Sequence, residues 1–436
     1  MSEIGKKVRC FLRDNGMHHE DIDMDQCCNI FIEEMQRGLA GQDSSLAMIP
    51  TYIEVGKDIP NDRSVIVLDA GGTNFRLATV HFDNSGKPVI ENSVQKPMPG
   101  LDRQCSKEEF FRTIVGYMAD FVDISDDIGF CFSYPTEILP NKDGRLIRFC
   151  KEVKAKEIEG QLIGQNLIAA IEAAGYKNGK RVVILNDTVA TLLAGISVLE
   201  KRAFDSYVGF ILGTGSNCCY IESNRNITKT DDLAPDGEQI INVESGSFAR
   251  APRGPIDFSL DKSTLDPGRY TFEKMFSGAY LGVLCLRTLQ QAAKQRLFSE
   301  TLAERLLATG QLETRDVNEF MHNPAGDNVL AVCCHKESEQ DRVAIWYLLD
   351  GLIERAAKLV AILLSAVVLK TGRGENPCMP VCITAEGTTF YELKSLRARV
   401  GCYLQTFLQN KHGRFIEIVS VEDATLIGAA IAGLTN

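Results

Sequence analysis

Apolar and polar positions along the chain follow two periods, one typical of strands and one typical of helices. Short apolar runs that end at glycine or polar residues predict strands at 64–86 (two strands around a tight glycine turn), 127–135, 181–187 and 206–223. Helical spacing predicts helices over most of 15–55, at 107–123, 158–176 and 188–199, and through much of 269–320 and 338–371. Further units of strand, loop and helix follow at 380–404 and 414–434. This alternation predicts an α/β fold.

A short internal match indicates that part of this fold is built twice. The letters GTN at 72–74 follow one apolar run, and GSN at 215–217 follows another. We interpret these segments as parts of two related α/β domains, each with one glycine hairpin, around a ligand-binding cleft. Hairpins of this kind are common in proteins, so a chance match is the alternative.

Length and charge narrow the class of protein. At about 150 residues per domain, a chain of 436 residues corresponds to two or three domains. The net charge of −11 argues against an electrostatic hold on nucleic acid or on anionic lipid. A phosphate-rich ligand would therefore need local compensation from backbone N–H groups, from a metal ion or from one well-placed basic side chain.

Cysteines and apolar runs bear on the cellular location. The chain has 14 cysteines but no C-x-x-C spacing, and its first residues are charged rather than apolar. We therefore expect a cytoplasmic protein with reduced thiols. The longest apolar run, 359–369, is shorter than the roughly 20 residues that a bilayer span requires, so it predicts a buried core helix and no membrane association.

Three glycine loops are candidates for binding phosphate. A glycine-rich turn lets several backbone N–H groups point into one small volume, which suits an anion. The segments DAGGTNFR (69–76) and LGTGSN (212–217) both fit, although each alone also suits an ordinary hairpin. Asp69 beside the first turn would repel phosphate unless a cation such as Mg²⁺ lay between them. The loop at 385–390 stands between a strand and a helix, where nucleotides often bind.

Polar residues at predicted strand ends suit a ligand with many hydroxyl groups. They are Ser133, Asn186, Asp187, Asn217, Glu244 and Glu273, and each alone also suits a turn or a helix cap. Asp187 is the strongest candidate, because it ends a buried strand where α/β folds place their sites. Lys151 has Lys154 and Lys156 nearby, which by itself favours a solvated basic face. The segment AVCCHK (331–336) lacks further ligands at metal-binding spacing.

Taken together, these segments resemble hexokinases of the eukaryotic type, including glucokinase, nearly from end to end. LDAGGTNFR and GTGSNCCYIE are similar to the two phosphate motifs of that family, and GFCFSYPTEILPNKDGRLIRFCKEVKAKEIEGQ is similar to its sugar-binding signature. ILNDTVATLLAG resembles the segment with the catalytic aspartate. NVESGSF and LDPGRYTFEKMFSGAYLG resemble the segments that supply two sugar-binding glutamates.

The resemblance implies an actin-like ATPase (ribonuclease H-like) fold with a hinged cleft. Residues 60–187 plus 424–436 would form the small domain, and 1–59 plus 188–423 the large domain. Asp187 would be the general base, and Lys151 would hold the sugar near its reacting hydroxyl. The implied sugar contacts are Ser133, Cys150, Lys151, Asn186, Asp187, Asn217, Glu244 and Glu273. The implied MgATP contacts are Asp69 (to Mg²⁺ through water), Gly71, Gly72, Thr73, Asn74, Arg76, Gly213, Thr214, Gly215, Gly387 and Thr388.

The resemblance thus implies transfer of a phosphoryl group from MgATP to the 6-hydroxyl of a hexose such as glucose. Two positions depart from the family pattern: Cys150 stands where threonine is usual before the lysine, and DATLIG (423–428) replaces a Gly-Ser-Gly-like run near the adenosine. Two other classes remain open from the residues alone. A sugar-binding regulator without turnover would keep this architecture, and a polymerising actin-like protein would leave the sugar signature unexplained.

Overall fold

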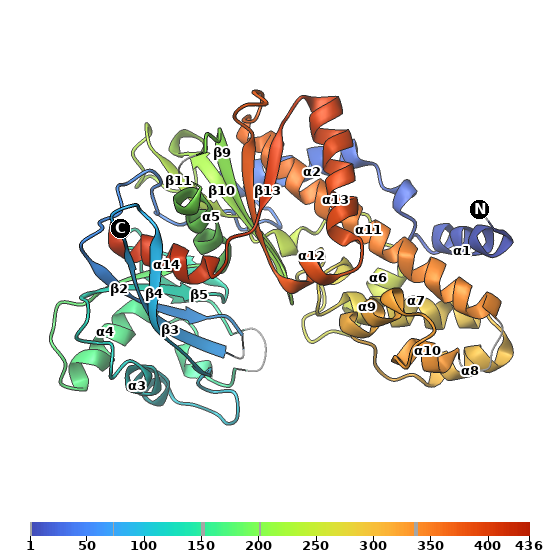
Figure 1. Cartoon of the computed structure of the whole chain (residues 1–436), viewed down its shortest axis with the longest axis horizontal. Helices are drawn as coiled ribbons and strands as arrows, with labels where there is room; N and C mark the ends of the chain where they lie inside the picture. The colour runs from blue at the N-terminus through green and yellow to red at the C-terminus, as the bar shows by residue number, and fades with distance from the viewer. Residues whose placement is uncertain (1, 73, 150–152, 200–201, 335–338) are drawn as a thin grey trace.

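The computed structural model describes residues 2–72, 74–149, 153–199, 202–334 and 339–436. Two main β-sheets organise these residues (Figure 1). The five-stranded sheet has the order β4 (Pro88–Pro97), β3 (Asn74–Phe82), β2 (Ser64–Ala70), β5 (Asp127–Phe132), β8 (Arg181–Leu185). The six-stranded sheet has the order β1 (Ile49–Pro50), β11 (Glu238–Asn242), β10 (Ser216–Ser223), β9 (Ser206–Leu212), β12 (Val381–Glu386), β13 (Ile416–Val419). A small hairpin pairs β6 (Thr136–Ile138) with β7 (Gly144–Leu146).

The two main sheets share one topology. In each, three strands that are consecutive in the chain pair antiparallel, β2–β3–β4 and β9–β10–β11, and two later strands add in parallel on the other side. The two predicted glycine hairpins, β2–β3 and β9–β10, therefore occupy equivalent places. The residue-by-residue match between them is wrong, however. The last pair of the first hairpin is Ala70 with Phe75, whereas Leu212 pairs with Ser216, so the second turn is shorter and Asn74 and Asn217 are not equivalent.

Two helices lie between the sheets and join them. The helix α14 (Ala424–Thr435) packs on β2 and β5, and α5 (Asp187–Val198) packs on β9, β10 and β12. The two helices also pack on each other (Figure 1). Their buried side chains form one apolar cluster with Val65 of the five-stranded sheet and Ile240 of the six-stranded sheet. The loop that enters α5 therefore lies at the junction of the two halves.

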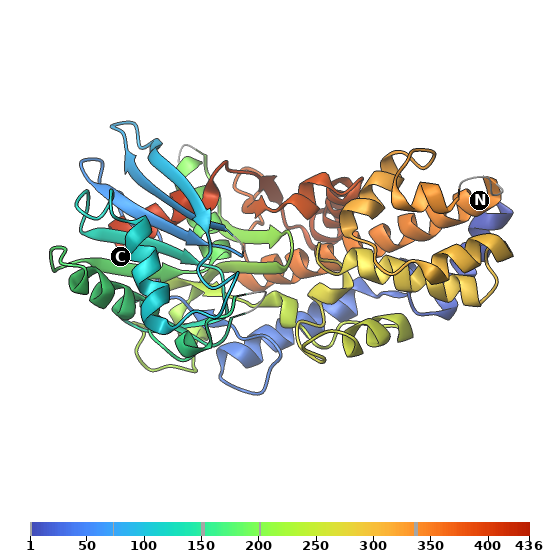
Figure 2. The same cartoon turned by 90° about the horizontal axis from the view of Figure 1, so that it is seen from below.

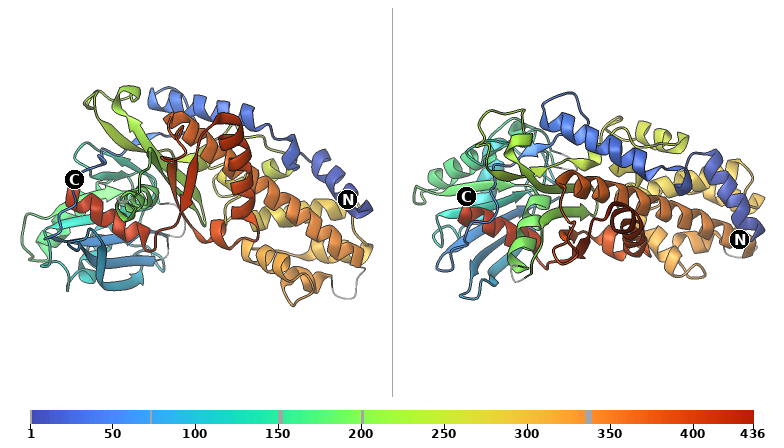
Figure 3. Two further views of the ribbon diagram at one scale, coloured as in Figure 1. Left: turned by 45° about the horizontal axis from the view of Figure 1, so that its top comes forward. Right: turned by 90° about the horizontal axis from the view of Figure 1, so that it is seen from above.

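We call the five-stranded sheet with its helices the first lobe, and the six-stranded sheet with its helices the second lobe. The first lobe carries α3 (Lys107–Tyr117) and α4 (Ile163–Ala173). The second lobe carries α1 (Glu3–Asp14), α2 (Met24–Leu39), α6 (Pro255–Lys262), α7 (Leu281–Lys294), α8 (Glu300–Ala308), α9 (Thr314–His322), α10 (Val329–Cys333), α11 (Glu339–Thr371), α12 (Thr388–Glu392) and α13 (Leu396–Leu404). The molecule is elongated, with α1 at the end opposite the first lobe (Figures 2 and 3).

The long helix α11 confirms the predicted core helix. Residues 359–368 are all buried inside the second lobe, against helices such as α2 and α13. In the part of the chain that the structure describes, no helix is both long and apolar enough to cross a membrane.

Several predicted elements differ from the observed ones for physical reasons. The strand β4 was not predicted, because it is an edge strand whose side chains are mostly exposed and so show no apolar alternation. The predicted helix at 15–55 is reduced mainly to α2, which ends at Leu39, and the chain then forms the short strand β1. The helix α6 was also missed, although Pro255 marks its first turn.

Candidate active site

A cavity of about 770 Å³ lies between the lobes and receives side chains from both. The predicted residues that line it are Gly71, Ser133, Asn186, Asp187, Thr214, Gly215, Asn217, Glu244 and Glu273. Further lining residues include Tyr134, Arg148, Phe149, Tyr270 and Tyr280. Residues that are far apart in sequence thus meet in one cavity, and most of them are hydrogen-bonding groups.

Asp187 and Asn186 enter the cavity where β8 ends and α5 begins. Asn186 is the helix cap, and its Oδ1 accepts hydrogen bonds from the N–H and the Oγ1 of Thr188 at 2.9 and 2.6 Å. The same N–H donates to Asp187 Oδ1 at 2.9 Å. The carboxylate therefore lies in the first turn of α5, at the positive end of the helix dipole.

Asn217 and Glu244, on one wall of the cavity, are linked through Asn242, which does not itself line the cavity. Asn217 Nδ2 donates to Asn242 Oδ1 at 2.8 Å, and Asn242 Nδ2 donates to Glu244 Oε1 at 2.9 Å. Glu244 has a left-handed backbone (φ +57°), which is rare for a side-chain-bearing residue. Burial raises the pKa of the Glu244 carboxyl, the hydrogen bond from Asn242 opposes this, and the charge of Asp187 adds to it. Asn242 was missed by sequence reasoning, although it stands two residues before Glu244 at a strand end.

Glu273 holds the second glycine turn in place. It begins a short 3₁₀ turn, and its Oε2 accepts a hydrogen bond from the N–H of Ser216 at 3.0 Å. A Cβ atom at Gly215 or at Gly246 would come within 3.0 Å of that same oxygen. The absence of a Cβ atom at these two glycines therefore leaves room for the carboxylate to approach the backbone so closely.

The first glycine turn is tied to a partly buried ion pair. Asp69 Oδ2 accepts hydrogen bonds from Arg76 Nε at 3.0 Å and from Thr425 Oγ1 at 3.0 Å. Tyr134 Oη donates to the carbonyl of Gly72 at 3.0 Å and so holds the turn against the first lobe. Asp69 and Arg76 do not line the cavity themselves. Thr425 was missed, and it places part of the unusual segment 423–428 beside this pair.

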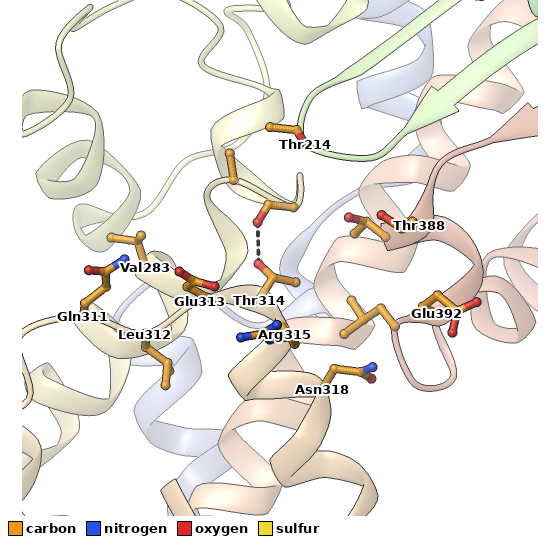
Figure 4. Close-up of a pocket in the computed structure, with 14 residues that line it drawn as sticks. Thr214, Val283, Gln311, Leu312, Glu313, Thr314, Arg315, Asn318, Thr388 and Glu392 are labelled. Carbon is orange, nitrogen blue, oxygen red and sulfur yellow. Dashed lines mark hydrogen bonds between the residues drawn. The ribbon is translucent and has the colours of Figure 1, made fainter. Parts of the chain in front are cut away.

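A second cavity of about 610 Å³ adjoins the first and shares Thr214 and Ala279 with it (Figure 4). Thr388, a predicted nucleotide contact, lines it. Thr314, Arg315 and Asn318 on α9 line it too (Figure 4). Sequence reasoning missed these three, because a polar first turn is an ordinary feature of surface helices.

Two predicted glycines shape the backbone next to this second cavity. Gly387 has φ +111°, and a Cβ atom there would lie 2.3 Å from the carbonyl oxygen of Leu212. The carbonyl of Gly213 accepts hydrogen bonds from Gly278 N–H at 2.8 Å and from Thr389 Oγ1 at 2.9 Å. Both glycines therefore position the second turn without lining either cavity.

The family described as Hexokinase matches this chain in two parts, over residues 12–197 and 207–435. The chain belongs to the hexokinase family.

Individual members of the hexokinase family agree with this assignment. Hexokinase-2 of Equus caballus is 30 % identical over 427 residues, which is 92 % of this chain and 45 % of the horse protein. Hexokinase-7 of Oryza sativa subsp. japonica is 29 % identical over 91 % of this chain and 90 % of the rice protein. The chain thus spans about half the length of the mammalian relative and nearly all of the plant relative.

Solved hexokinase structures share the fold. The hexokinase from Schistosoma mansoni complexed with glucose superimposes with a TM-score of 0.81 and 25 % identity, over 100 % of this chain and 99 % of that chain. A second hexokinase crystal structure gives a TM-score of 0.75 at 20 % identity, over 99 % of this chain and 98 % of that chain. The predicted actin-like ATPase fold is therefore confirmed.

Some positions predicted from the hexokinase resemblance are not placed in a cavity. Thr73, Cys150 and Lys151 lie outside the described residues. Asn74, which follows Thr73, is exposed at the start of β3 and lines neither cavity. Within the described ranges, no group of three or more His, Cys, Asp or Glu side chains could hold a metal ion.

Proposed function

We propose that this chain transfers the γ-phosphoryl group of MgATP to the 6-hydroxyl of a hexose such as glucose, giving hexose 6-phosphate and ADP. One observation carries the proposal. The acid- and amide-lined cavity and both glycine turns meet at one place, and a second cavity opens from the same turn at Thr214. A sugar and a nucleotide could therefore lie end to end with the phosphates between them.

The first cavity suits a hexose because its polar groups are mainly acceptors and amides. Ser133 would contact the sugar from the first lobe, and Glu244 and Glu273 from the second. Asn186 and Asn217 would add amide contacts, and the resemblance adds Cys150 and Lys151. Such a constellation recognises hydroxyl groups by paired hydrogen bonds, which a purely apolar ligand could not satisfy.

Asp187 is the proposed general base. It would take the proton of the 6-hydroxyl while that oxygen forms a bond to the γ-phosphorus, and the bond from this phosphorus to the oxygen of the departing ADP breaks. Phosphoryl transfer requires mainly alignment and charge neutralisation from the protein. A well-placed base contributes about 10²–10⁴-fold in rate.

The residues around the first glycine turn fit Mg²⁺ that arrives as MgATP. Mg²⁺ usually keeps several waters and takes few protein ligands when phosphates bind it. Asp69 suits that role. Because its Oδ2 already accepts hydrogen bonds from Arg76 and Thr425, we assign it a contact with Mg²⁺ through water. Backbone N–H groups of Gly71, Gly72 and Gly215 would bind the phosphates, and Thr388 with the α9 residues would face the nucleoside.

We also propose the domain division 60–187 plus 424–436 against 1–59 plus 188–423. It is supported by the position of β2, β3, β4, β5 and β8 in one sheet and by the packing of α14 on that sheet. Sugar ligands from both domains would let hexose binding close the cleft and exclude water from the phosphoryl group.

A coupled assay of ADP release, run with and without glucose, tests the proposal. We expect release that depends strongly on glucose. Glucose binding without release would indicate a sugar-binding regulator, and sugar-independent hydrolysis with filament formation would indicate an actin-like structural protein. Either outcome would overturn the proposed activity.

A further inference from the structure

The two lobes touch across the first cavity through Arg148 and Tyr270. Arg148 Nη2 donates a hydrogen bond to Tyr270 Oη at 2.6 Å, and the guanidinium carbon lies 5.1 Å from the centre of the tyrosine ring. Both residues line the cavity, and both are partly exposed, so the contact lies at its rim. Because the rim is where a ligand must pass, this pair is suited to control how long a bound sugar stays.

Arg148 is firmly held in the first lobe. The ring of the next residue, Phe149, packs edge-on against Tyr134 and Phe132, with centroids 5.0 and 6.3 Å apart. On the other side, Ile147 N–H donates to the carbonyl of Pro135 at 2.9 Å. The backbone around Arg148 therefore moves with the first lobe.

Tyr270 is held in the second lobe in a strained conformation. Its φ of +49° lies in the left-handed region, which costs a bulky residue energy unless its surroundings enforce it. The buried ammonium group of Lys274 fixes the loop that precedes it. It donates hydrogen bonds to Asp261 Oδ1 at 2.9 Å, to Thr264 Oγ1 at 2.8 Å and to the carbonyl of Asp266 at 2.9 Å. This loop holds the tyrosine ring at the rim.

The charge distribution in the cavity gives the contact between Arg148 and Tyr270 an electrostatic role. Its other charged residues, among those that the structure describes, are Asp187, Glu244, Asp266 and Glu273, all acidic, and Arg148 is the basic one. Glu244, Asp266 and Glu273 lie on the second lobe and Asp187 lies at the start of α5, so this acidic charge faces Arg148 from across the cleft. Arg148 on the first lobe is attracted to these acids, and its charge-assisted hydrogen bond to Tyr270 forms only when the lobes are close.

We propose that Arg148 and Tyr270 form a clasp that holds the lobes together over a bound hexose and so determines how tightly the sugar is retained. The proposal rests on the proposed function, because it takes a hexose as the ligand of the cavity. A hydrogen bond to a charged group together with a cation–π contact should favour the closed, sugar-bound form by about tenfold.

Glucose affinity by calorimetry, together with steady-state kinetics, tests the clasp in four variants: Tyr270→Phe, Arg148→Gln, Arg148→Lys and the double variant Arg148→Gln/Tyr270→Phe. The control is Arg145→Gln, which removes a positive charge from the same lobe but from a side chain directed at Glu137 and Gly160. We expect each of the first two variants to weaken glucose binding by about five- to tenfold. KM should rise with kcat within about twofold, since the contact is made before and during transfer.

The double variant and the conservative variant distinguish a clasp from general loss of structure. The double variant should bind glucose no more weakly than Arg148→Gln, because both changes remove one shared contact. Arg148→Lys should keep part of the affinity, and Arg145→Gln should behave as the parent. Additive effects, or unchanged affinity in both single variants, would overturn the clasp while leaving the proposed function standing. A parent that binds glucose without transfer would overturn the function and leave the clasp measurable, and a parent that binds no sugar would overturn both.

Discussion

Replacing Gly428 by alanine tests how closely the two central helices pack. Gly428 lies on α14 at its contact with α5, and a Cβ atom there would stand 1.8 Å from the carbonyl oxygen of Ala190 and 2.5 Å from its Cα. A Cβ contact under 3.0 Å is sterically forbidden. The helices would therefore have to move apart until the distance from the new Cβ atom to the Ala190 oxygen rises from 1.8 Å to at least 3.0 Å. Ala190 is one turn after Asp187, so this strain acts directly on the proposed catalytic helix.

Neither helix can move away from the other, because each packs closely against a strand behind it. A Cβ atom at Gly195, elsewhere on α5, would lie 1.9 Å from Thr384 Oγ1 on β12. A Cβ atom at Gly129, on β5 behind α14, would lie 1.8 Å from the carbonyl oxygen of Ala429. Overpacking of a tight core usually costs 1–3 kcal/mol, and this backing places Gly428→Ala near the upper end, at about 3 kcal/mol.

Urea unfolding and turnover with glucose measure the effect. We expect a free energy of unfolding lower by about 3 kcal/mol. We also expect kcat to fall by about tenfold or more, because a shift of about 1 Å at a catalytic group can cost 10²-fold. The matched control is Gly116→Ala on α3, where a Cβ atom has nothing within 4 Å. There, alanine should stabilise the helix by about 0.4–1 kcal/mol. If Gly428→Ala unfolded at the same urea concentration as Gly116→Ala, the close contact between α5 and α14 would be refuted.

Four further outcomes are expected. Asp187→Ala should lower kcat by at least ~10²-fold while glucose affinity measured by calorimetry stays within about tenfold, and a residual kcat above about a tenth of the parent value would contradict its role as base. Saturating glucose should reduce the radius of gyration in small-angle scattering, and an unchanged radius would argue against cleft closure. Cys150→Thr should lower the KM for glucose or mannose by roughly two- to tenfold with kcat little changed, because a hydroxyl is a better hydrogen-bonding partner than a thiol, and unchanged KM values for both sugars would mean that the position only packs. Burial raises the pKa of the Cys218 thiol to about 12. After iodoacetamide treatment at about pH 8, mass spectrometry should therefore find Cys218 unmodified and the exposed Cys10 and Cys378 labelled. Labelling of Cys218 at that pH would contradict this expectation.

Local chemistry explains why much of the site could be predicted from sequence. Asp187 follows a buried strand and opens a helix, and both facts are visible in a few neighbouring letters. The glycine turns at 71–72 and 213–215 are likewise short motifs, and Gly72 has the positive φ (+112°) that favours glycine. The family resemblance then ordered these motifs along one chain, which indicated a single cleft.

Other site residues could not be found this way, because their surroundings are assembled from distant segments. Asn242 matters only through its hydrogen bonds to Asn217 and Glu244, and Thr425 only because α14 returns to Asp69 from the far end of the chain. The letters at 72–74 and 215–217 even suggested a wrong equivalence, since strand register is set by pairing across the sheet and not by residue identity.

The sequence by itself determined the fold class, the family and the identity of the groups that could perform the chemistry. The tertiary structure alone decided which of those groups share a cavity, which ones support it from behind, and where the lobes meet at Arg148 and Tyr270. The physical reason is that residue type sets what a side chain can bond to, whereas its actual partners depend on packing such as that of α5 on α14, where a single carbon atom at Gly428 has no space.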